Sequence, residues 1–248
     1  MGNNKTNKKE HVTKENKKEV KKITKENPKH EILLSIQNAS YRYSDALPDE
    51  YALKDITYDF KKGKIYAIRG RSGTGKTTLL SLISGLERCT EGTILFDGKN
   101  LKDINLDTYR NSQIGIVFQS YNLLPYMTAS ENIILSMDAS GQKIANKKQK
   151  AIELMESVGL KSSYADRKVL RLSGGEQQRV AIARSLSYNP KMIVADEPTG
   201  NLDKQTETEI LEIFKKLAHK EGKCVIIVTH SQNVCDIVDE VYDLKKIK

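Results

Sequence analysis

The chain has 248 residues, of which 38% are hydrophobic and 29% are charged, a composition typical of a globular protein of one domain or a compact pair. No apolar run approaches the ~18 residues of a membrane span, and the N-terminus has no apolar signal-peptide core, so we expect a cytosolic protein. The cysteines, Cys89, Cys224 and Cys235, have no C-x-x-C spacing, which argues against zinc ligands and disulfides and predicts reduced packing residues.

Positive charge is concentrated at the N-terminus. The net charge is +9, and residues 1–30 contribute +6 of it, with ten lysines against four glutamates. Such a segment has too few apolar residues to offset the entropy of ordering, so we predict a disordered lysine-rich tail over residues 1–30. A solvated tail is the simpler interpretation, and attraction to anionic lipid headgroups is the alternative.

From residue 31 onward, apolar runs typical of strands alternate with segments of helical periodicity. The predicted strands cover residues 32–36, 53–60, 64–69, 93–96, 114–118, 192–195, 224–229 and about 241–244. The predicted helices cover residues 78–84, 132–137, 147–158, 173–188 and 204–220, the second of them opened by a capping box of Thr128 and Glu131. This order predicts an α/β fold with a mostly parallel sheet and an inserted helical subdomain at about residues 120–178.

One glycine-rich loop fits G-x-x-x-x-G-K-[ST] at every fixed position and lies between a predicted strand and a predicted helix. It reads Gly70, Arg71, Ser72, Gly73, Thr74, Gly75, Lys76, Thr77, and Thr78 follows it. Its glycines let successive N–H groups point inward as an anion nest, and the helix start adds its positive dipole end. Lys76 would reach the β- and γ-phosphates, and the Thr77 hydroxyl would ligate Mg²⁺. An ordinary glycine turn would not need lysine and threonine at these two positions.

A second apolar strand, residues 192–195, ends in Asp196 and Glu197. The carboxyl end of a parallel strand opens onto the ligand crevice of such a sheet. Asp196 would hold Mg²⁺, directly or through water, and Glu197 would accept a proton from an attacking water. A solvated strand end also explains two acids, but the phosphate loop upstream favours the functional interpretation.

A third stretch contains Ser173, Gly174, Gly175 and Glu176 at a predicted helix start. Ser173 and Glu176 have capping-box spacing, which explains the serine without any ligand. It does not explain two glycines in the first turn, where each costs about 1 kcal/mol relative to alanine. Close approach of backbone N–H groups to an anion does explain them. A chain with two anion-binding helix starts indicates that a second molecule takes part.

Together these motifs are similar to those of a known family. Residues 31–248 resemble the nucleotide-binding ATPase subunit of ABC transporters. The segments that match, in the family's order, are 70–77, 118–119, 172–177, 196–197, 201–203 and 229–230. The resemblance implies a P-loop NTPase core with a mostly parallel sheet, an antiparallel β subdomain and an inserted α-helical subdomain, and it implies an ATPase that uses ATP and Mg²⁺.

The resemblance also implies roles for single residues. Tyr43 would stack on adenine, with Tyr41 as the alternative. Gln119 would join Thr77 and Asp196 around Mg²⁺ and report the nucleotide state. Glu197 would be the general base, and His230 would orient the water and the γ-phosphate. The segment 201–203 would pass signals between subunits. Ser173, Gly174 and Gly175 would bind ATP held by the opposite protomer, which implies an ATP-dependent head-to-tail homodimer.

Two stretches, residues 118–125 and 197–203, resemble the lipoprotein-release, macrolide-export and cell-division branch. The branch implies an integral-membrane permease as partner, an export or mechanotransmission role, no specific nucleic acid, and a peripheral position on the inner face of the membrane. Arg171 departs from the family pattern, where a more neutral residue is usual. A soluble ABC ATPase that acts on nucleic acid or ribosomes is the alternative, favoured only by the basic tail.

Overall fold

The computed structural model describes residues 1–2 and 31–247. The tail predicted for residues 1–30 therefore lies outside the described residues, apart from Met1 and Gly2. Among the described residues, no helix has the length and apolar character that a membrane span requires.

The first sheet has four antiparallel strands in the order β2-β1-β4-β5. Its strands are β1 (Ile32–Tyr41), β2 (Leu53–Lys61), β4 (Glu91–Phe96) and β5 (Lys99–Asn100). Asp97 and Gly98 join β4 to β5 with φ angles of 51° and 75°. Positive φ at both central residues is what a type I′ hairpin turn requires, so the Asp-Gly pair explains the turn. This sheet is the antiparallel part of the predicted fold.

The second sheet has five strands in the order β6-β7-β8-β3-β9, and every neighbouring pair is parallel. Its strands are β3 (Ile65–Arg69), β6 (Ile114–Val117), β7 (Met192–Asp196), β8 (Cys224–Thr229) and β9 (Glu240–Asp243). The strands β7 and β8 are almost uninterrupted apolar runs because both of their faces are buried. The α/β fold with a parallel sheet is therefore confirmed.

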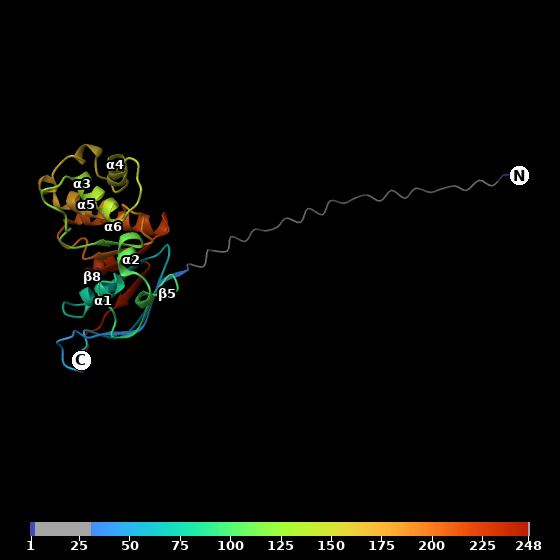
Figure 1. The fold of residues 1–248 in the computed structure, drawn as a ribbon, viewed down its shortest axis with the longest axis vertical. Coiled ribbons are helices and arrows are strands. Elements are labelled where there is room, and N and C mark those ends of the chain that lie inside the picture. Colours follow the sequence, from blue (N-terminus) through green and yellow to red (C-terminus); the bar gives the residue numbers. More distant parts are fainter. Residues whose placement is uncertain (3–30, 248) are drawn as a thin grey trace.

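The helices lie around this sheet and beyond one end of it. They are α1 (Lys76–Ile83), α2 (Leu106–Ser112), α3 (Ala129–Ala139), α4 (Lys147–Ser157), α5 (Gly174–Ser185), α6 (Lys204–His219) and α7 (Gln232–Cys235). In Figure 1, α3, α4 and α5 gather at one end of the molecule, while α1 lies with the sheets. This arrangement is consistent with helices inserted between β6 and β7.

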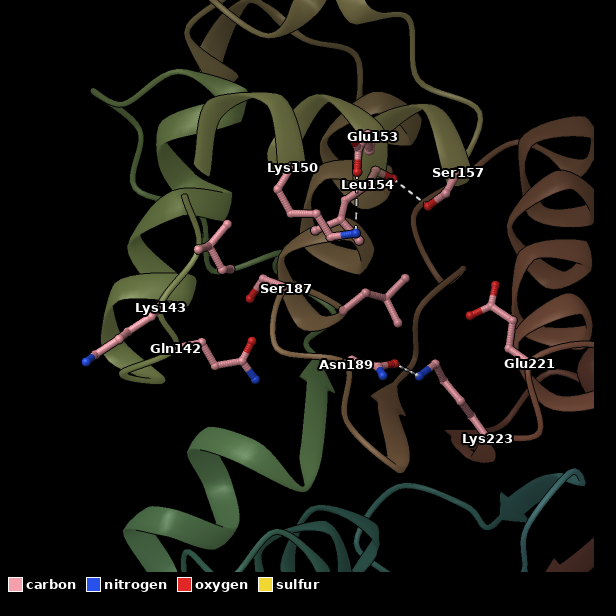
Figure 2. Close-up of a pocket in the computed structure, with 12 residues that line it drawn as sticks. Gln142, Lys143, Lys150, Glu153, Leu154, Ser157, Ser187, Asn189, Glu221 and Lys223 are labelled. Carbon is pink, nitrogen blue, oxygen red and sulfur yellow. Dashed lines mark hydrogen bonds and ion pairs between the residues drawn. The ribbon is translucent and has the colours of Figure 1, made fainter. Parts of the chain in front are cut away.

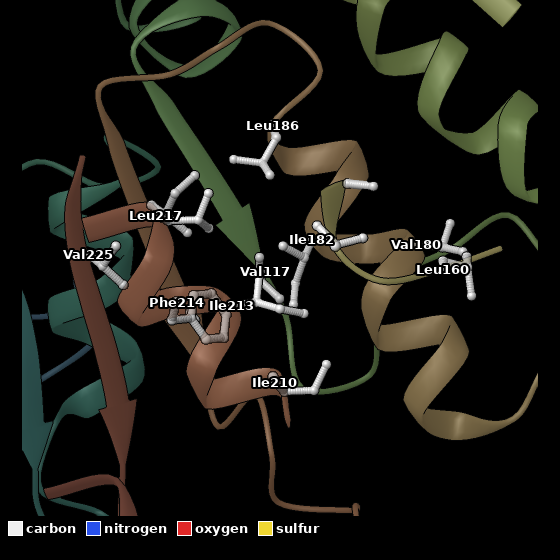
Figure 3. Packing of buried hydrophobic residues seen from close by; sticks show 14 of the residues in the cluster. Val117, Leu160, Val180, Ile182, Leu186, Ile210, Ile213, Phe214, Leu217 and Val225 are labelled. Atoms are coloured by element: carbon white, nitrogen blue, oxygen red, sulfur yellow. The ribbon is translucent and has the colours of Figure 1, made fainter. Parts of the chain in front are cut away.

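The core has two parts, one on each face of the parallel sheet. Ile65 and Ala67 of β3 belong to one buried cluster, whereas Tyr66 and Ile68 belong to the other, because successive side chains of a strand point to opposite faces. Figure 3 shows the first cluster, in which Phe214 of α6 and its neighbours pack beside β6 and α5. This packing fixes the strand ends that carry the predicted site.

The structure corrects several predicted boundaries. The helix predicted to extend to residue 188 ends at Ser185, and Asn189 adopts a left-handed φ of 52° before the next strand. Much of residues 120–172 is irregular, with α3, α4 and two short 3₁₀ turns. The prediction missed α2, whose N-cap Asn105 accepts a hydrogen bond from Thr108 N, because an asparagine cap without an apolar stripe is a weak signal.

Candidate functional site

The phosphate loop joins the end of β3 to the start of α1. Gly75 is the N-cap of α1 with a left-handed φ of 89°, and no side chain caps this helix. A Cβ at Gly75 would lie 2.6 Å from the Ala52 carbonyl oxygen, so glycine is required by space as well as by φ. The first N–H groups of α1 are therefore free of side-chain acceptors and available to an anion.

The Lys76 side chain folds back onto the phosphate loop. Its Nζ donates to the carbonyl oxygen of Gly70 at 2.8 Å and to that of Arg71 at 3.3 Å. The Thr74 hydroxyl also donates to the Arg71 carbonyl, at 2.9 Å. The loop thus holds an ammonium group beside its N–H groups, which concentrates positive charge where phosphates would bind.

An open pocket of about 870 Å³ adjoins the loop. Its lining residues come from the phosphate loop, from His230 and from the end of the chain; they are Arg69, Gly70, Arg71, Ser72, Thr74, His230, Asp243, Leu244, Lys245 and Lys246. Ser173, Gly174 and Gly175 are not among them. The structure therefore brings part of the phosphate loop and His230 together. Several other predicted site residues also lie outside this lining, among them Lys76, Thr77 and Glu197.

Glu197 contacts His230 although 33 positions separate them in the chain. Glu197 Oε1 lies 2.7 Å from His230 Nδ1, and Oε2 accepts a hydrogen bond from the Thr229 hydroxyl at 3.1 Å. Glu197 has a left-handed φ of 43°, which is strained for a residue with a side chain. Its side chain is 11% exposed, whereas that of His230 is 70% exposed. Thr229 and His230 thus orient the largely buried carboxylate of Glu197, while the exposed His230 imidazole lines the pocket.

No role was predicted for Thr229 beyond its place before His230. A threonine at the last position of a buried strand, directly before that histidine, was the available signal.

Asp196 lies next to Glu197 at the end of β7. Burial and then the charge of Glu197 raise the pKa of the Asp196 carboxyl, and the Lys76 ammonium opposes this shift. Gln119 belongs to the same region, because a Cβ on Gly200 would lie 3.5 Å both from Gln119 Nε2 and from the Glu197 carbonyl oxygen. With the exposed Thr77 hydroxyl, this set offers oxygen donors of the kind that Mg²⁺ prefers.

The two tyrosines proposed for adenine differ in exposure. Tyr43 is 49% exposed and Tyr41 is 7% exposed, and their rings meet edge to face at 5.1 Å. Tyr43 lies two residues beyond the end of β1, and its hydroxyl is 2.9 Å from Thr78 Oγ1. Tyr43 is therefore the ring that can offer a face to a ligand beside α1, whereas Tyr41 is a packing residue.

At the serine-glycine start of α5, side chains of the same segment cap the backbone N–H groups. Ser173 Oγ accepts from Glu176 N at 3.3 Å, and the Glu176 carboxylate accepts from Ser173 N at 2.8 Å, which is the predicted capping box. A Cβ on Gly175 would lie 2.5 Å from Thr206 Cγ2 of α6. Packing against α6 is thus a reason for this glycine that the sequence analysis did not consider.

Comparisons with known proteins agree with this geometry. The family described as ABC transporter matches residues 53–200. The ABC transporter ATP-binding protein YclH of Bacillus subtilis is 49% identical over 207 residues, which is 84% of this chain and 91% of that protein. The lipoprotein-releasing system ATP-binding protein LolD of Francisella tularensis is 39% identical over 220 residues, which is 87% of this chain and 94% of that protein.

A solved structure with the same fold is the dimeric ABC transporter cassette MJ0796, a protein of Methanocaldococcus jannaschii. It is 37% identical, covers 86% of this chain and 94% of its own, and has a TM-score of 0.78. A second dimeric structure of MJ0796, with the same TM-score of 0.78, is a post-hydrolysis state bound to ADP and Pi. The fold, the phosphate loop and these relatives agree: the chain belongs to the ABC transporter family as an ATP-binding, ATP-hydrolysing subunit.

Proposed function

We propose that this chain hydrolyses Mg-ATP in a pocket completed by a second copy of itself. The observation that carries the proposal is the uncapped helix start at Gly75 beside Lys76, together with the contact between Glu197 and His230, since these offer a phosphate site and a base. A head-to-tail pair would bring the helix start of one copy to the nucleotide held by the other. The solved structures of MJ0796 are dimeric, which supports the participation of a second copy.

In the proposed complex, Lys76 and the N–H groups of residues 73–78 bind the phosphates. Tyr43 stacks on the adenine ring, because it is exposed and lies beside Thr78 at the start of α1. Gly70, Arg71, Ser72 and Thr74 complete the loop that surrounds the phosphates.

Hydrolysis requires a base for the attacking water. Glu197 takes this role in our proposal, because Thr229 and His230 hold its carboxylate in one orientation. If the Nδ1–H of a neutral His230 ring donates to Glu197, Nε2 is an acceptor and can take a hydrogen bond from the attacking water. As Glu197 takes a proton from the water, the water oxygen bonds to the γ-phosphorus, the bond from this phosphorus to the β,γ-bridging oxygen breaks, and ADP and phosphate are the products.

Thr77, Gln119 and Asp196 would hold Mg²⁺, and their hydroxyl, amide and carboxylate oxygens suit it. The metal ion would neutralise charge on the β- and γ-phosphates. The raised pKa of Asp196 reflects a buried carboxyl beside a second acid, an environment that a cation relieves.

At the level of the assembly, we propose one ATPase domain over residues 31–248, with a helical subdomain at about 120–178. ATP closes the dimer and hydrolysis reopens it, so the two states bind a permease partner differently. Such a partner would hold the subunit on the inner face of the membrane. The likeness to LolD, a lipoprotein-releasing system protein, supports an export or mechanotransmission role.

The test is Glu197→Gln in saturating Mg-ATP. We expect turnover to fall by about 10²–10⁴-fold, because the base is lost, while nucleotide binding persists. The variant should then accumulate as an ATP-bound dimer in light scattering. A variant that hydrolyses ATP at a near-normal rate would exclude Glu197 as the base, and one that stays monomeric would exclude the shared pocket.

A further inference from the structure

A second pocket lies at the amino-terminal ends of β7 and β8 in the parallel sheet, the end opposite to the phosphate loop. It has a volume of about 620 Å³. It is bounded by α4, by the loop after α3, by the segment between α5 and β7, and by the turn before β8. Asn189 and Lys223 precede the starts of β7 and β8, whereas the phosphate loop follows the end of β3. Because these strands are parallel, a ligand here would not touch the nucleotide.

The pocket contains a buried cation. Lys223 is 7% exposed, and its Nζ donates to Asn189 Oδ1 at 2.7 Å and to the Pro190 carbonyl oxygen at 2.9 Å. An ammonium group has three N–H donors, so one donor has no acceptor among the residues that the structure describes. None of the ion pairs within residues 31–247 includes Lys223, although a buried charge is normally paired.

A buried hydroxyl lies in the same pocket. Ser187 is 4% exposed, and its Oγ has no hydrogen-bond partner in the described part of the chain. In Figure 2, Ser187 and Asn189 lie between Gln142 on one side and Lys223 on the other. A buried polar group without a partner is unusual in a folded protein and calls for a ligand or a water.

The remaining lining is partly apolar. Ile144, Leu154 and Leu186 contribute aliphatic side chains to the pocket. Lys150 also lines the pocket, and its Nζ lies 3.4 Å from Glu153 Oε2. Burial lowers the pKa of the Lys223 ammonium, and the charge of Glu221, which also lines the pocket, partly opposes this shift.

We propose that this pocket binds a small organic anion, whose carboxylate or phosphate group accepts hydrogen bonds from Lys223 and Ser187 while its apolar body contacts Leu154 and Leu186. The anion supplies the missing acceptor for the ammonium and a partner for the hydroxyl. Because α4 and the loop after α3 form one wall and the loops before β7 and β8 form the other, the ligand ties these two parts together.

The experiment uses the full chain in excess Mg-ADP, so that the probes do not compete at the phosphate loop. Hexanoate and hexyl phosphate are titrated separately, and hexanol serves as a neutral probe with the same apolar body. Backbone amide signals of residues 187–189 are followed by NMR. We expect both anions, but not hexanol, to shift these signals, and the tighter anion identifies the headgroup that the site prefers.

Three variants locate the contact. Lys223→Met should weaken anion binding by at least about tenfold, and Ser187→Ala by about threefold, since a charged and a neutral hydrogen bond are lost respectively. Lys143→Met is the matched control, because Lys143 points away from the pocket in Figure 2, and it should change affinity by less than about twofold.

Ser187→Ala removes a hydroxyl that has no partner, so the variant should keep the thermal midpoint of the parent. It therefore remains decisive if Lys223→Met does not fold. Unchanged signals with both anions would overturn the proposal, and so would equal shifts with hexanol. If Lys223→Met folds, unchanged anion affinity in both variants would also overturn the proposal. If Lys223→Met does not fold, unchanged anion affinity in Ser187→Ala would do so alone.

Discussion

Two helix starts in this molecule are built in opposite ways. The helix α1 begins at Gly75, in a left-handed conformation, with no side-chain cap and no acidic residue in its first turn. The helix α5 begins at Ser173, with a complete capping box and the acidic Glu176 in its first turn. Both carry the glycines that the sequence analysis assigned to anion binding.

The difference indicates that the two starts are unequal anion sites. The open N–H groups of α1 and the nearby Lys76 can bind phosphate without rearrangement. At α5, side chains already occupy N–H groups, and the Glu176 carboxylate opposes a further negative charge. We therefore expect α5 to contribute only when another site already holds the phosphate, as in the proposed dimer.

Removing the positive charge at α1 should have the largest effect. Lys76→Ala should weaken ATP binding by about a hundredfold or more, because charge-assisted hydrogen bonds to phosphate are lost. Isothermal titration of ATP into the purified chain measures this. Lys99→Ala, at an exposed lysine of β5, is the control. Unchanged affinity in Lys76→Ala would mean that the open helix start is not the phosphate site.

Substitutions at Gly175 test why α5 has a glycine at this position: because of packing against α6, or because an anion must approach the backbone. Gly175→Ala should cost about 1–3 kcal/mol of stability, because the new methyl group would overlap Thr206 Cγ2. Adding Thr206→Ser removes that methyl group but keeps a hydroxyl for Asp203, so the double variant should recover its midpoint in urea unfolding. If stability returns but ATP-driven dimerisation does not, anion approach also requires the glycine.

The two capping boxes found within residues 31–247 form a matched pair for the next test. Ser173→Ala should lower stability by about 1 kcal/mol, and Thr128→Ala at α3 should do the same, because each removes one N-cap acceptor. Only Ser173→Ala should weaken ATP-driven dimerisation, and neither should change ATP affinity of the monomer. Equal loss of dimer in both variants would show that helix stability, not contact with nucleotide, is responsible.

The smallest effect concerns the acid that faces Lys76. The pKa of the Asp196 carboxyl is raised, so its ionised form disfavours the folded state at neutral pH, and this cost disappears as the pH falls below the ordinary value for aspartate. Asp196→Asn should thus raise the thermal midpoint slightly at about pH 7 and much less at about pH 4. Mg²⁺-dependent hydrolysis should fall in the same variant.

A pH-independent gain in Asp196→Asn would contradict the raised pKa. Unchanged hydrolysis would remove Asp196 from the proposed metal site. The thermal midpoint thus reports the electrostatic environment of the Asp196 carboxyl, and hydrolysis reports its role in the proposed metal site.

Local signals account for what the sequence predicted well. The phosphate loop follows from glycines that need left-handed φ, and both capping boxes follow from a fixed spacing of three residues. The hairpin turn at Asp97 and Gly98 is equally local. Boundaries were less accurate where the chain turns without such a signal, as after Ser185, where Asn189 takes the left-handed position in place of glycine.

The sequence by itself determined the α/β fold, the phosphate loop and the acidic strand end, because each depends on neighbouring residues and on strand or helix periodicity. Only the tertiary structure decided that Tyr43 is exposed and Tyr41 buried, and that Gly175 packs on Thr206. It alone brought Glu197 to His230, and Lys223 to Asn189, across 33 and 34 positions of the chain. Such contacts depend on the order and register of parallel strands, which no short stretch of sequence encodes.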